Sequence, residues 1–235
     1  MSKNKLKKFA AISTFPNVYE NFTHDNPQLV GVDGTIVDLK GQWAKKHFKN
    51  NLSAEQAGNP ITLELACGKG HYTLGLARQY PNRNFIGVDI KGARIWKGAA
   101  TALEENLTNV AFLRTRIEQI NSFFEKDEID EIWITFPDPF LKKENRRLTG
   151  PRFLERYRKI LKEDGVVHLK TDSDELFEFT MEVLENEKEV TIQYQDNDIY
   201  AKSLPMPELD IKTYYELMHL AIGKTIKYVQ FKLTS

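Results

Sequence analysis

Two acidic residues and two glycines stand where strand-like runs of the chain give way to helical patterns. Glu64 lies near the end of one apolar run, Gly68 and Gly70 follow it, and Asp89 ends the next apolar run. Glycines at such a turn let the backbone approach a ligand without a Cβ in the way. An acid about 20 residues further on can accept hydrogen bonds from both hydroxyls of a ribose. The spacing predicts a pocket for a nucleotide-like ligand; the alternative is a tight turn with only a structural role.

The charge beside the turn indicates which nucleotide-like ligand it suits. Dinucleotide-binding folds place G-x-G-x-x-G and a helix N-terminus against a pyrophosphate. Here the turn reads C-G-K-G-H-Y-T after Glu64, whose carboxylate would repel a pyrophosphate. A carboxylate favours a cationic cofactor such as S-adenosylmethionine, which carries a sulfonium and an ammonium group. The pattern E-x-x-C-G-x-G resembles the first motif of the Rossmann-like methyltransferases over about residues 60–170, and a dehydrogenase becomes the weakest alternative.

A third carboxylate, Asp138, stands between two prolines after the apolar run EIWITF. Prolines restrict the backbone and remove competing N–H donors. We therefore expect this carboxylate to point to the carboxyl edge of the sheet, where open α/β folds bind ligands. The alternative is an Asx-type turn, in which the side chain bonds its own backbone.

The chain is neutral overall but carries a local basic block. It has 33 Lys and Arg against 33 Asp and Glu, and eight of the basic residues lie within residues 142–159. Phosphate contacts of such residues fix the register of a bound RNA and make its affinity salt-dependent. Solvated helix faces are the alternative for any one charge run. The basic residues predicted to meet phosphates include Lys143, Arg146 and Arg147 in this block and Lys3, Lys5, Lys7 and Lys8 near the N-terminus.

Composition excludes several classes of protein. No apolar run approaches the roughly 20 residues that cross a bilayer, and the basic N-terminus is not followed by an apolar signal core. The sequence therefore predicts a cytoplasmic protein without a membrane partner. Cys67 is the single cysteine, so neither an intramolecular disulfide nor a cysteine-based metal cage is expected, and we expect no metal site.

The elements that must position these residues alternate between strand-like and helical patterns from residue 60 onward. This alternation predicts βαβ units, a mostly parallel sheet and a final antiparallel strand. Residues 1–59 are predicted to form an N-terminal extension, partly irregular, with one short helix near Trp43–Phe48. Residues 60–235 form the expected catalytic domain, and residues 196–211 are expected to be a loop.

The second half of the chain carries a set of closely spaced motifs. They are F-P-D-P-x-x-K-K, R-R-L-T, F-x-x-x-Y-x-x-x-L, a strand that ends in K-T-D, and T-x-Y-E. Together they resemble the bacterial tRNA (guanine-N7)-methyltransferase family over residues 60–233. The resemblance implies an α/β, Rossmann-like class I methyltransferase fold with a seven-stranded sheet and helices on both faces. It also implies transfer of a methyl group from S-adenosylmethionine to N7 of a guanosine in tRNA, expected in the variable loop.

The resemblance implies roles for the matching positions. Asp138 is the expected catalytic residue. The expected cofactor-binding residues are Glu64, Gly68, Gly70, Asp89, Arg116 and Asp138. The expected contacts to the target nucleotide are Lys142, Asp172, Thr213, Tyr214, Tyr215 and Glu216, with Lys143, Arg146 and Arg147 as RNA contacts.

Three departures from the family pattern stand out. Arg116 occupies a place where related enzymes often carry Asp or Asn, and arginine has no acceptor for an adenine amine, so the backbone or Glu118 would have to replace it. The basic loop after Lys143 is short, and Leu217-Met218-His219 follows T-x-Y-E where many members carry a basic residue. Two alternative functions remain at this point, a methyltransferase of the same fold with another substrate and a non-catalytic RNA-binding module. Either a monomer or a homodimer is compatible with the sequence.

Overall fold

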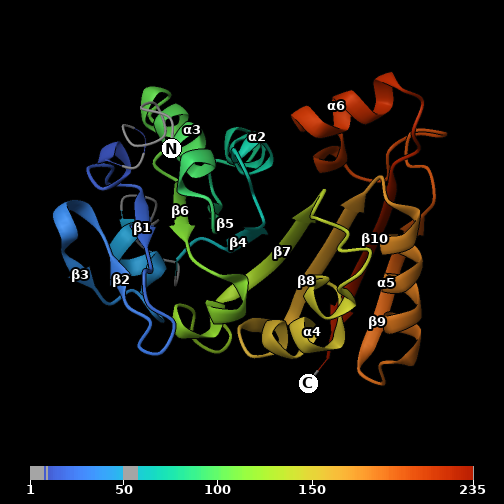
Figure 1. Ribbon diagram of the computed structural model, residues 1–235, viewed down its shortest axis with the longest axis horizontal. Coiled ribbons are helices and arrows are strands. Elements are labelled where there is room, and N and C mark those ends of the chain that lie inside the picture. Colours follow the sequence, from blue (N-terminus) through green and yellow to red (C-terminus); the bar gives the residue numbers. More distant parts are fainter. Residues whose placement is uncertain (1–7, 9, 50–57, 235) are drawn as a thin grey trace.

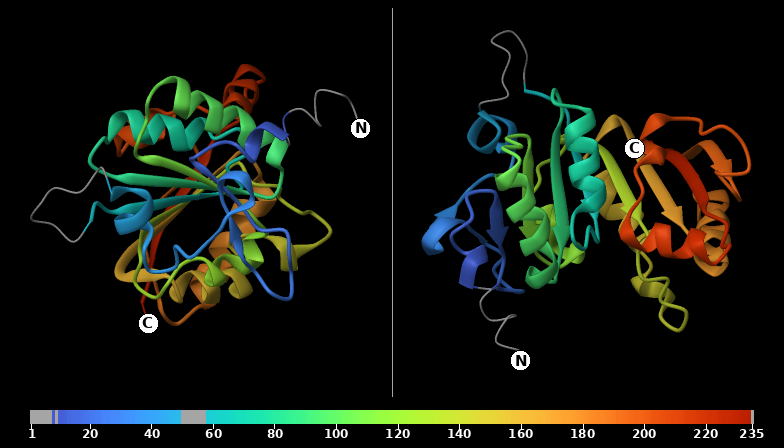
Figure 2. Two further views of the ribbon diagram at one scale, coloured as in Figure 1. Left: turned by 90° about the vertical axis from the view of Figure 1, so that its left-hand side faces the viewer. Right: turned by 90° about the horizontal axis from the view of Figure 1, so that it is seen from above.

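The computed structural model describes residues 8, 10–49 and 58–234, which build one twisted sheet with helices on both faces (Figure 1; Figure 2, left). The described strands, in chain order, are β1 (Val18–Glu20), β2 (Leu29–Val30), β3 (Ile36–Val37), β4 (Ile61–Leu65), β5 (Asn84–Asp89), β6 (Val110–Arg114), β7 (Ile129–Thr135), β8 (Leu161–Thr171), β9 (Val190–Asp196) and β10 (Lys227–Leu233). The described helices are α2 (His71–Gln79), α3 (Gly92–Glu104), α4 (Pro151–Arg158), α5 (Asp174–Asn186) and α6 (Tyr214–Ala221). Shorter helical turns are η1 (Val32–Gly34), η2 (Trp43–His47), η4 (Ile117–Ser122), η5 (Glu144–Arg146) and η6 (Pro207–Asp210).

Strands β4 to β10 form the sheet that the sequence predicts. Their spatial order is β6-β5-β4-β7-β8-β10-β9. The strands from β6 to β8 run parallel, and β10 lies antiparallel between β8 and β9. The predictions of a mostly parallel sheet and an antiparallel final strand are therefore confirmed.

The sheet is larger than the seven strands expected, because the N-terminal region adds three. β1 pairs in parallel with β6, with Val18 opposite Phe112, and β2 and β3 continue the sheet as antiparallel strands. An exposed edge strand presents a row of unpaired N–H and C=O groups, and β1 satisfies those of β6. The predicted short helix near Trp43–Phe48 is present as η2, a π-helix.

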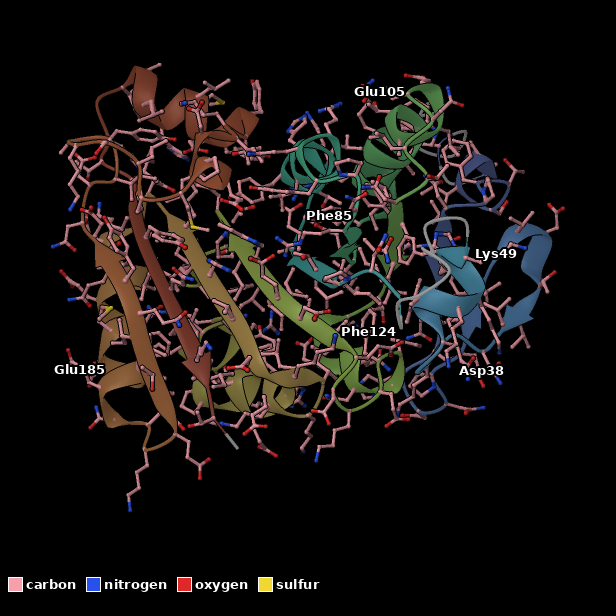
Figure 3. The ribbon with its side chains drawn as sticks, turned by 180° about the vertical axis from the view of Figure 1, so that it is seen from behind. Asp38, Lys49, Phe85, Glu105, Phe124 and Glu185 are labelled. Carbon is pink, nitrogen blue, oxygen red and sulfur yellow. The ribbon has the colours of Figure 1, made fainter. Side chains whose placement is uncertain are left out.

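Burial explains why the central strands read as continuous apolar runs. Every residue of β4 and β5 is buried, which fits parallel strands that are covered on both faces. One apolar core lies between the sheet and α2 and α3, and includes Phe85; the other lies against α4 and α5, and includes Phe124. Phe85 and Phe124 are labelled in Figure 3, and Phe124 stacks on the buried Trp43 of η2 at 5.6 Å between ring centroids. None of the helices within the described ranges is long and apolar enough to cross a membrane.

The topology places a crevice at the carboxyl ends of the parallel strands. The chain moves outward from β4 through β5 to β6, then returns to the other side of β4 to form β7 and β8. Such a reversal of strand order opens a ligand crevice at the carboxyl edge. Helix α6 lies beyond the tips of β7 and β8 at this edge (Figure 1). The segment before α6 is fixed to α2, because the Tyr72 hydroxyl donates to the Glu208 carbonyl at 2.9 Å.

Candidate active site

A cavity of about 1120 Å³ opens at this carboxyl edge. Its walls come from the segments that follow β4, β5, β6, β7 and β8, and from α6 and the turn after it. The volume exceeds the roughly 300–1,000 Å³ of common small-molecule sites and leaves room for two reactants. The predicted site residues that line it are Asp89, Arg116, Asp138, Arg146, Asp172 and Tyr215.

The backbone is strained at three residues that line this cavity. Ala66 (φ 60°), Phe136 (φ 47°) and Phe140 (φ 43°) are non-glycine residues in the left-handed region, and all three line the cavity. Each such conformation costs about 1–3 kcal/mol and persists only when the surrounding structure enforces it. Ala66 and Phe136 follow the adjacent strands β4 and β7, so the strain bends both strand ends at the centre of the crevice.

Glu64 lies beneath the glycine turn and is almost completely buried. Its Oε2 accepts hydrogen bonds from the Thr73 amide at 2.8 Å and from the Thr73 hydroxyl, and its Oε1 accepts from the Thr135 hydroxyl at 2.7 Å. Burial raises the pKa of Glu64 to about 7. The carboxyl group therefore ties β4 to α2 and β7 and sits behind the cavity wall. A cation above the turn would favour its ionised form.

Both glycines of the turn are required by the structure, through different contacts. Gly68 adopts φ 57°, and its amide donates to Asp89 Oδ2 at 2.9 Å, while the Lys91 amide donates to Asp89 Oδ1 at 2.7 Å. Gly70 is also left-handed (φ 69°), and a Cβ on it would lie 2.6 Å from the ring of Phe112 in β6, so only glycine fits between the turn and this strand. Asp89, at the end of β5, is therefore held at the cavity wall by one backbone amide on each oxygen.

The loop after β6 receives support from the N-terminal region, which sequence reasoning missed. Arg116 is exposed on this loop and lines the cavity. The Asn21 side-chain amide donates to Thr115 Oγ1 at 3.2 Å and to Gln119 Oε1 at 3.1 Å. The Gln119 amide in turn donates to the Thr23 carbonyl at 3.1 Å. A lone asparagine in an irregular segment has no periodic signal that would reveal this contact across 94 residues.

Asp138 combines the two roles that the sequence left open. It is exposed and lines the cavity, as expected for a residue that meets substrate. Its Oδ1 also accepts from the Phe140 amide at 3.0 Å, which is an Asx-type turn. This internal bond fixes the side chain while leaving acceptor capacity on the carboxylate for a ligand.

The basic loop presents only part of its charge. Lys142, Lys143 and Arg146 are exposed, and Arg146 reaches the cavity wall. The Nζ of Lys8 lies 4.7 Å from the centroid of the Trp96 ring. The other predicted N-terminal phosphate contacts, Lys3, Lys5 and Lys7, lie outside the described residues.

Arg147 differs from its neighbour Arg146, because it is buried with 5% of its surface exposed. Its Nε donates to the Pro139 carbonyl at 3.0 Å, and its guanidinium lies 4.5 Å from the centroid of the Phe179 ring. A guanidinium held this way braces the loop from within. The structure does not bring Arg147 to the surface where Lys142, Lys143 and Arg146 are presented.

The T-x-Y-E motif divides into internal and external residues. Thr213 and Glu216 form a capping box at the start of α6. Glu216 is fully buried, pairs with the Lys170 ammonium at 2.7 Å and accepts from the Tyr200 hydroxyl at 2.6 Å. Lys170 is fully buried as well, and it belongs to the K-T-D motif. Two motifs far apart in the sequence therefore lock α6 onto β8, and Glu216 is held inside the protein.

The two tyrosines of the motif face outward. Tyr214 and Tyr215 are exposed, and their rings meet edge to face at 5.8 Å between centroids. Tyr215 lines the cavity. The Lys69 ammonium of the glycine turn lies 5.2 Å from the centroid of the Tyr214 ring, within cation–π range. α6 therefore spans from the cavity to the glycine turn after β4.

Asp172 lines the cavity and has two basic neighbours that sequence reasoning missed. Its Oδ2 lies 2.6 Å from Lys224 Nζ and 3.4 Å from His219 Nδ1, and all three residues line the cavity. The ring of His219 also stacks near Phe136 at 6.2 Å between centroids. No local pattern reveals the contact with Lys224, because the two residues lie 52 positions apart in the sequence.

The cysteine beside the glycine turn has a packing role. Cys67 is buried beside the turn, and burial raises the pKa of its thiol well above the ordinary value, so it serves packing and is not poised as a nucleophile. In the part of the chain that the structure describes, no group of three or more His, Cys, Asp or Glu side chains is arranged to hold a metal ion.

The strand order of the sheet and the crevice at its carboxyl edge are those of a Rossmann-like class I methyltransferase. The antiparallel strand β10, which lies between β8 and the edge strand β9, belongs to the same fold. Solved structures with this fold include the 16S rRNA methyltransferase KamB (12% identity, TM-score 0.62, covering 92% of this chain and 99% of that one). The 30S ribosomal A1408 methyltransferase from an uncultured bacterium is similar too (15% identity, TM-score 0.57, covering 85% and 97%). At these identities the likeness concerns the fold alone.

Sequence relatives narrow the class to one family. Residues 58–228 match the family described as "Putative methyltransferase". A tRNA (guanine-N(7)-)-methyltransferase of Bacteroides fragilis (strain YCH46) is 47% identical over 99% of this chain and 87% of its own length. That of Christiangramia forsetii is 46% identical over 99% of both chains. The chain belongs to the bacterial tRNA (guanine-N(7)-)-methyltransferase family, as the motifs indicated.

Proposed function

We propose that this enzyme transfers a methyl group from S-adenosylmethionine to N7 of a guanosine in the variable loop of tRNA. One observation carries the proposal. Asp89 on the cofactor side and Asp138 and Asp172 on the substrate side face a single cavity, and Arg146 stands at its rim. The family relationship supports the choice of tRNA and guanine N7, since the relatives carry that name.

The cofactor half of the cavity fits a cationic nucleoside. S-adenosylmethionine, when bound, supplies a methyl group activated by a sulfonium. Asp89 accepts one backbone amide on each oxygen, and a carboxylate has about four acceptor sites, so it retains capacity for ribose hydroxyls. The buried Glu64 adds negative charge behind the turn, and the left-handed Gly68 keeps the backbone open to a close approach. Arg116 and Glu118 line the part of the cavity where the adenine would lie.

The chemistry demands alignment more than proton transfer. Guanine N7 has an exposed lone pair and no proton, so no general base is needed to create the nucleophile. The enzyme holds the two reactants in line, which converts a bimolecular step into an effectively unimolecular one. Guanine becomes cationic on methylation, and a carboxylate fixed nearby stabilises the developing charge. Asp138 is suited to this role, because its Asx-type bond to Phe140 fixes it at the cavity wall.

Recognition of guanine requires acceptors for its N1–H and N2–H groups. Asp138 and Asp172 both face the cavity and can provide them. Glu216 is less suited, because its carboxylate is buried and paired with Lys170. Lys142, Lys143 and Arg146 are exposed beside the cavity and are placed to meet the phosphates of the RNA.

The direct test is mass spectrometry of nucleosides from an unmodified tRNA transcript incubated with the enzyme and S-adenosylmethionine. We expect 7-methylguanosine, located in the variable loop by nuclease mapping. A transcript whose variable-loop guanosine is replaced by adenosine is the matched control and should stay unmodified. A different methylated nucleoside, or methylation of the control transcript, would contradict the proposal.

A further inference from the structure

We propose that Lys224 is a positioning residue that orients the Asp172 carboxylate for guanine recognition, with His219 as a second support. The inference rests on the proposed function and names the device that prepares one of its substrate contacts. Lys224 follows the T-x-Y-E helix and lies 52 residues from Asp172 in the sequence.

The two basic side chains act on one oxygen of the carboxylate. Lys224 Nζ donates to Asp172 Oδ2 at 2.6 Å, and His219 Nδ1 lies 3.4 Å from the same oxygen. Within the described residues, Asp172 Oδ1 has no hydrogen-bond partner, although the side chain is only 16% exposed. One oxygen is therefore held by the protein, and the other remains as an acceptor at the cavity wall.

The local backbone brings Lys224 to this place. α6 ends at Ala221, and Gly223 adopts the left-handed region with φ 75°. The Lys224 amide then donates back to the His219 carbonyl at 3.1 Å, which closes the turn after the helix. A left-handed glycine after a helix reverses the chain at low cost. The reversal returns Lys224 to the cavity, where it and His219 approach Asp172 from adjacent points of one turn.

The two ends of α6 are held by different contacts. The buried pair of Lys170 and Glu216 fixes the start of the helix. Its end is held at the cavity by His219, which stacks near Phe136, and by Lys224, whose side chain is 44% exposed. The Asp172 contact therefore joins the end of α6 to the segment after β8, beside the pairing of Lys227 with Thr171. Losing it would free the carboxylate.

A fixed carboxylate favours guanine in two ways. Guanine presents N1–H and N2–H donors to an acceptor such as Asp172 Oδ1, whereas adenine presents an acceptor at N1. Holding the side chain before binding also reduces the entropy that is lost when the nucleotide is bound. The competing interpretation is that Lys224 leaves Asp172 and contacts an RNA phosphate directly, because a half-exposed lysine can do either.

A double-mutant cycle separates these interpretations. Lys224→Ala, Asp172→Asn and the double variant are compared in single-turnover rate, KM for tRNA and salt dependence of tRNA binding. We expect Lys224→Ala to lower kcat/KM on the order of tenfold, since a charge-assisted contact is lost. The double variant should fall no further than Asp172→Asn, and the salt slope should stay unchanged. Lys224→Arg should restore most of the activity.

The matched control is the ion pair of Lys232 and Asp164, whose charged atoms are 2.8 Å apart and which does not line the cavity. Lys232→Ala should leave all three measurements unchanged, and thermal unfolding of every variant confirms that it is folded. Additive effects in the cycle, a salt slope reduced by about one unit, or full activity of Lys224→Ala would each overturn the inference. If the wild-type enzyme methylates tRNA and the cycle is additive, only the positioning role fails; if the wild-type enzyme forms no 7-methylguanosine, the proposed function fails and the inference with it.

Discussion

Key charged groups of the two proposed halves of the cavity are held in different ways, although Arg116 and Glu118 are exposed in the first half and Asp172 is largely buried in the second. In the cofactor half, Glu64 and Asp89 are buried at strand ends, and their oxygens accept from backbone amides or threonine hydroxyls. In the substrate half, Asp138, Lys142 and Arg146 are exposed on loops. Under the proposed function, the first half would hold one small ligand that is the same in every turnover. The second would receive a large polyanion, for which exposed charges are suited.

The support behind each half follows the same division. The cofactor half rests on β4 and β5, in which every residue is buried, and on the loop that Asn21 secures from the N-terminal region. The substrate half rests on α6, where Leu217 and Met218 remain exposed, and on the residue after it, Ile222, which is exposed as well. Substitutions in the first half should therefore change cofactor affinity, whereas substitutions in the second should change methyl transfer or the grip on RNA.

The largest expected effect tests whether Asp138 belongs to the chemistry. We expect Asp138→Asn to slow single-turnover methyl transfer by about 100- to 1,000-fold, as for the loss of a fixed group that stabilises transition-state charge. Affinity for tRNA should stay within a few-fold, because a carboxylate adds nothing to phosphate attraction. Rapid-quench kinetics beside filter binding measure both quantities. A variant that transfers methyl groups at the wild-type rate would remove Asp138 from the reaction.

The next effect tests the cofactor half alone. Asp89→Ala removes a carboxylate that accepts from the Gly68 and Lys91 amides and faces the cavity. We expect S-adenosylmethionine to bind about ten- to a hundredfold more weakly, which corresponds to the loss of charge-assisted hydrogen bonds. Calorimetry gives the affinity, and tRNA binding in the absence of cofactor serves as the control. Equal losses for both ligands would show that the two halves are not independent.

The residues predicted for the cofactor half come from one local unit of the chain, whereas those predicted for the substrate half come from distant segments. Glu64, Gly68, Gly70 and Asp89 belong to one βαβ unit, in which local strand and turn patterns decide the arrangement. Asp89 lines the cavity, whereas Glu64 is buried behind its wall. The added strands β1 to β3 were missed, because two- and three-residue strands carry too few residues for a periodic signal.

The substrate half depends on contacts between distant segments. Lys170 and Glu216 form a buried pair across 46 positions of the chain, and no local pattern shows that two charged residues neutralise each other inside the protein. The sequence alone also does not show which of two adjacent arginines is buried. Arg146 and Arg147 have the same side chain, and tertiary contacts, among them those with Pro139 and Phe179, accompany the burial of Arg147.

A moderate effect is expected on the pH dependence of stability and of cofactor affinity, through Glu64. Burial raises the pKa of Glu64 from 4.5 to about 7, so the folded protein holds this proton more tightly than the unfolded chain does. Without cofactor, the contribution of Glu64 to stability should therefore fall as the pH rises from about 4.5 to about 7. A cationic cofactor favours the ionised form, so its affinity should rise over pH 5–7 by at most about tenfold per unit.

Glu64→Gln is the matched variant for this pH effect, because glutamine keeps the shape and cannot ionise. Its affinity for S-adenosylmethionine should be nearly constant over the same range. Calorimetry in two buffers of different ionisation enthalpy also reports the proton that the wild-type enzyme releases on binding. A glutamine variant with the wild-type pH slope would assign the effect to another group.

The smallest expected effect is on tRNA binding, and it compares two neighbouring arginines of the basic loop. Arg146→Ala should weaken tRNA binding a few-fold and reduce its salt slope by about one unit, because one exposed phosphate contact is lost. Arg147→Ala should leave the salt slope unchanged, because its guanidinium is bound to the Pro139 carbonyl and lies over Phe179. It should instead lower stability by about 1–3 kcal/mol through the loss of a buried charged hydrogen bond. Filter binding across a salt series and thermal unfolding measure both variants side by side.

The two arginines are a stringent pair, because they are adjacent, chemically identical and differ only in burial. If charge in this loop acted through the overall field, both substitutions would reduce the salt slope equally. If burial decides, the slope follows Arg146 and the unfolding temperature follows Arg147, with a shift of about 2–4 °C for each kcal/mol in a chain of this size. A reversed result, with Arg147→Ala altering the slope at unchanged stability, would mean that the loop opens when RNA binds, and that the substrate half adapts further than its free structure shows.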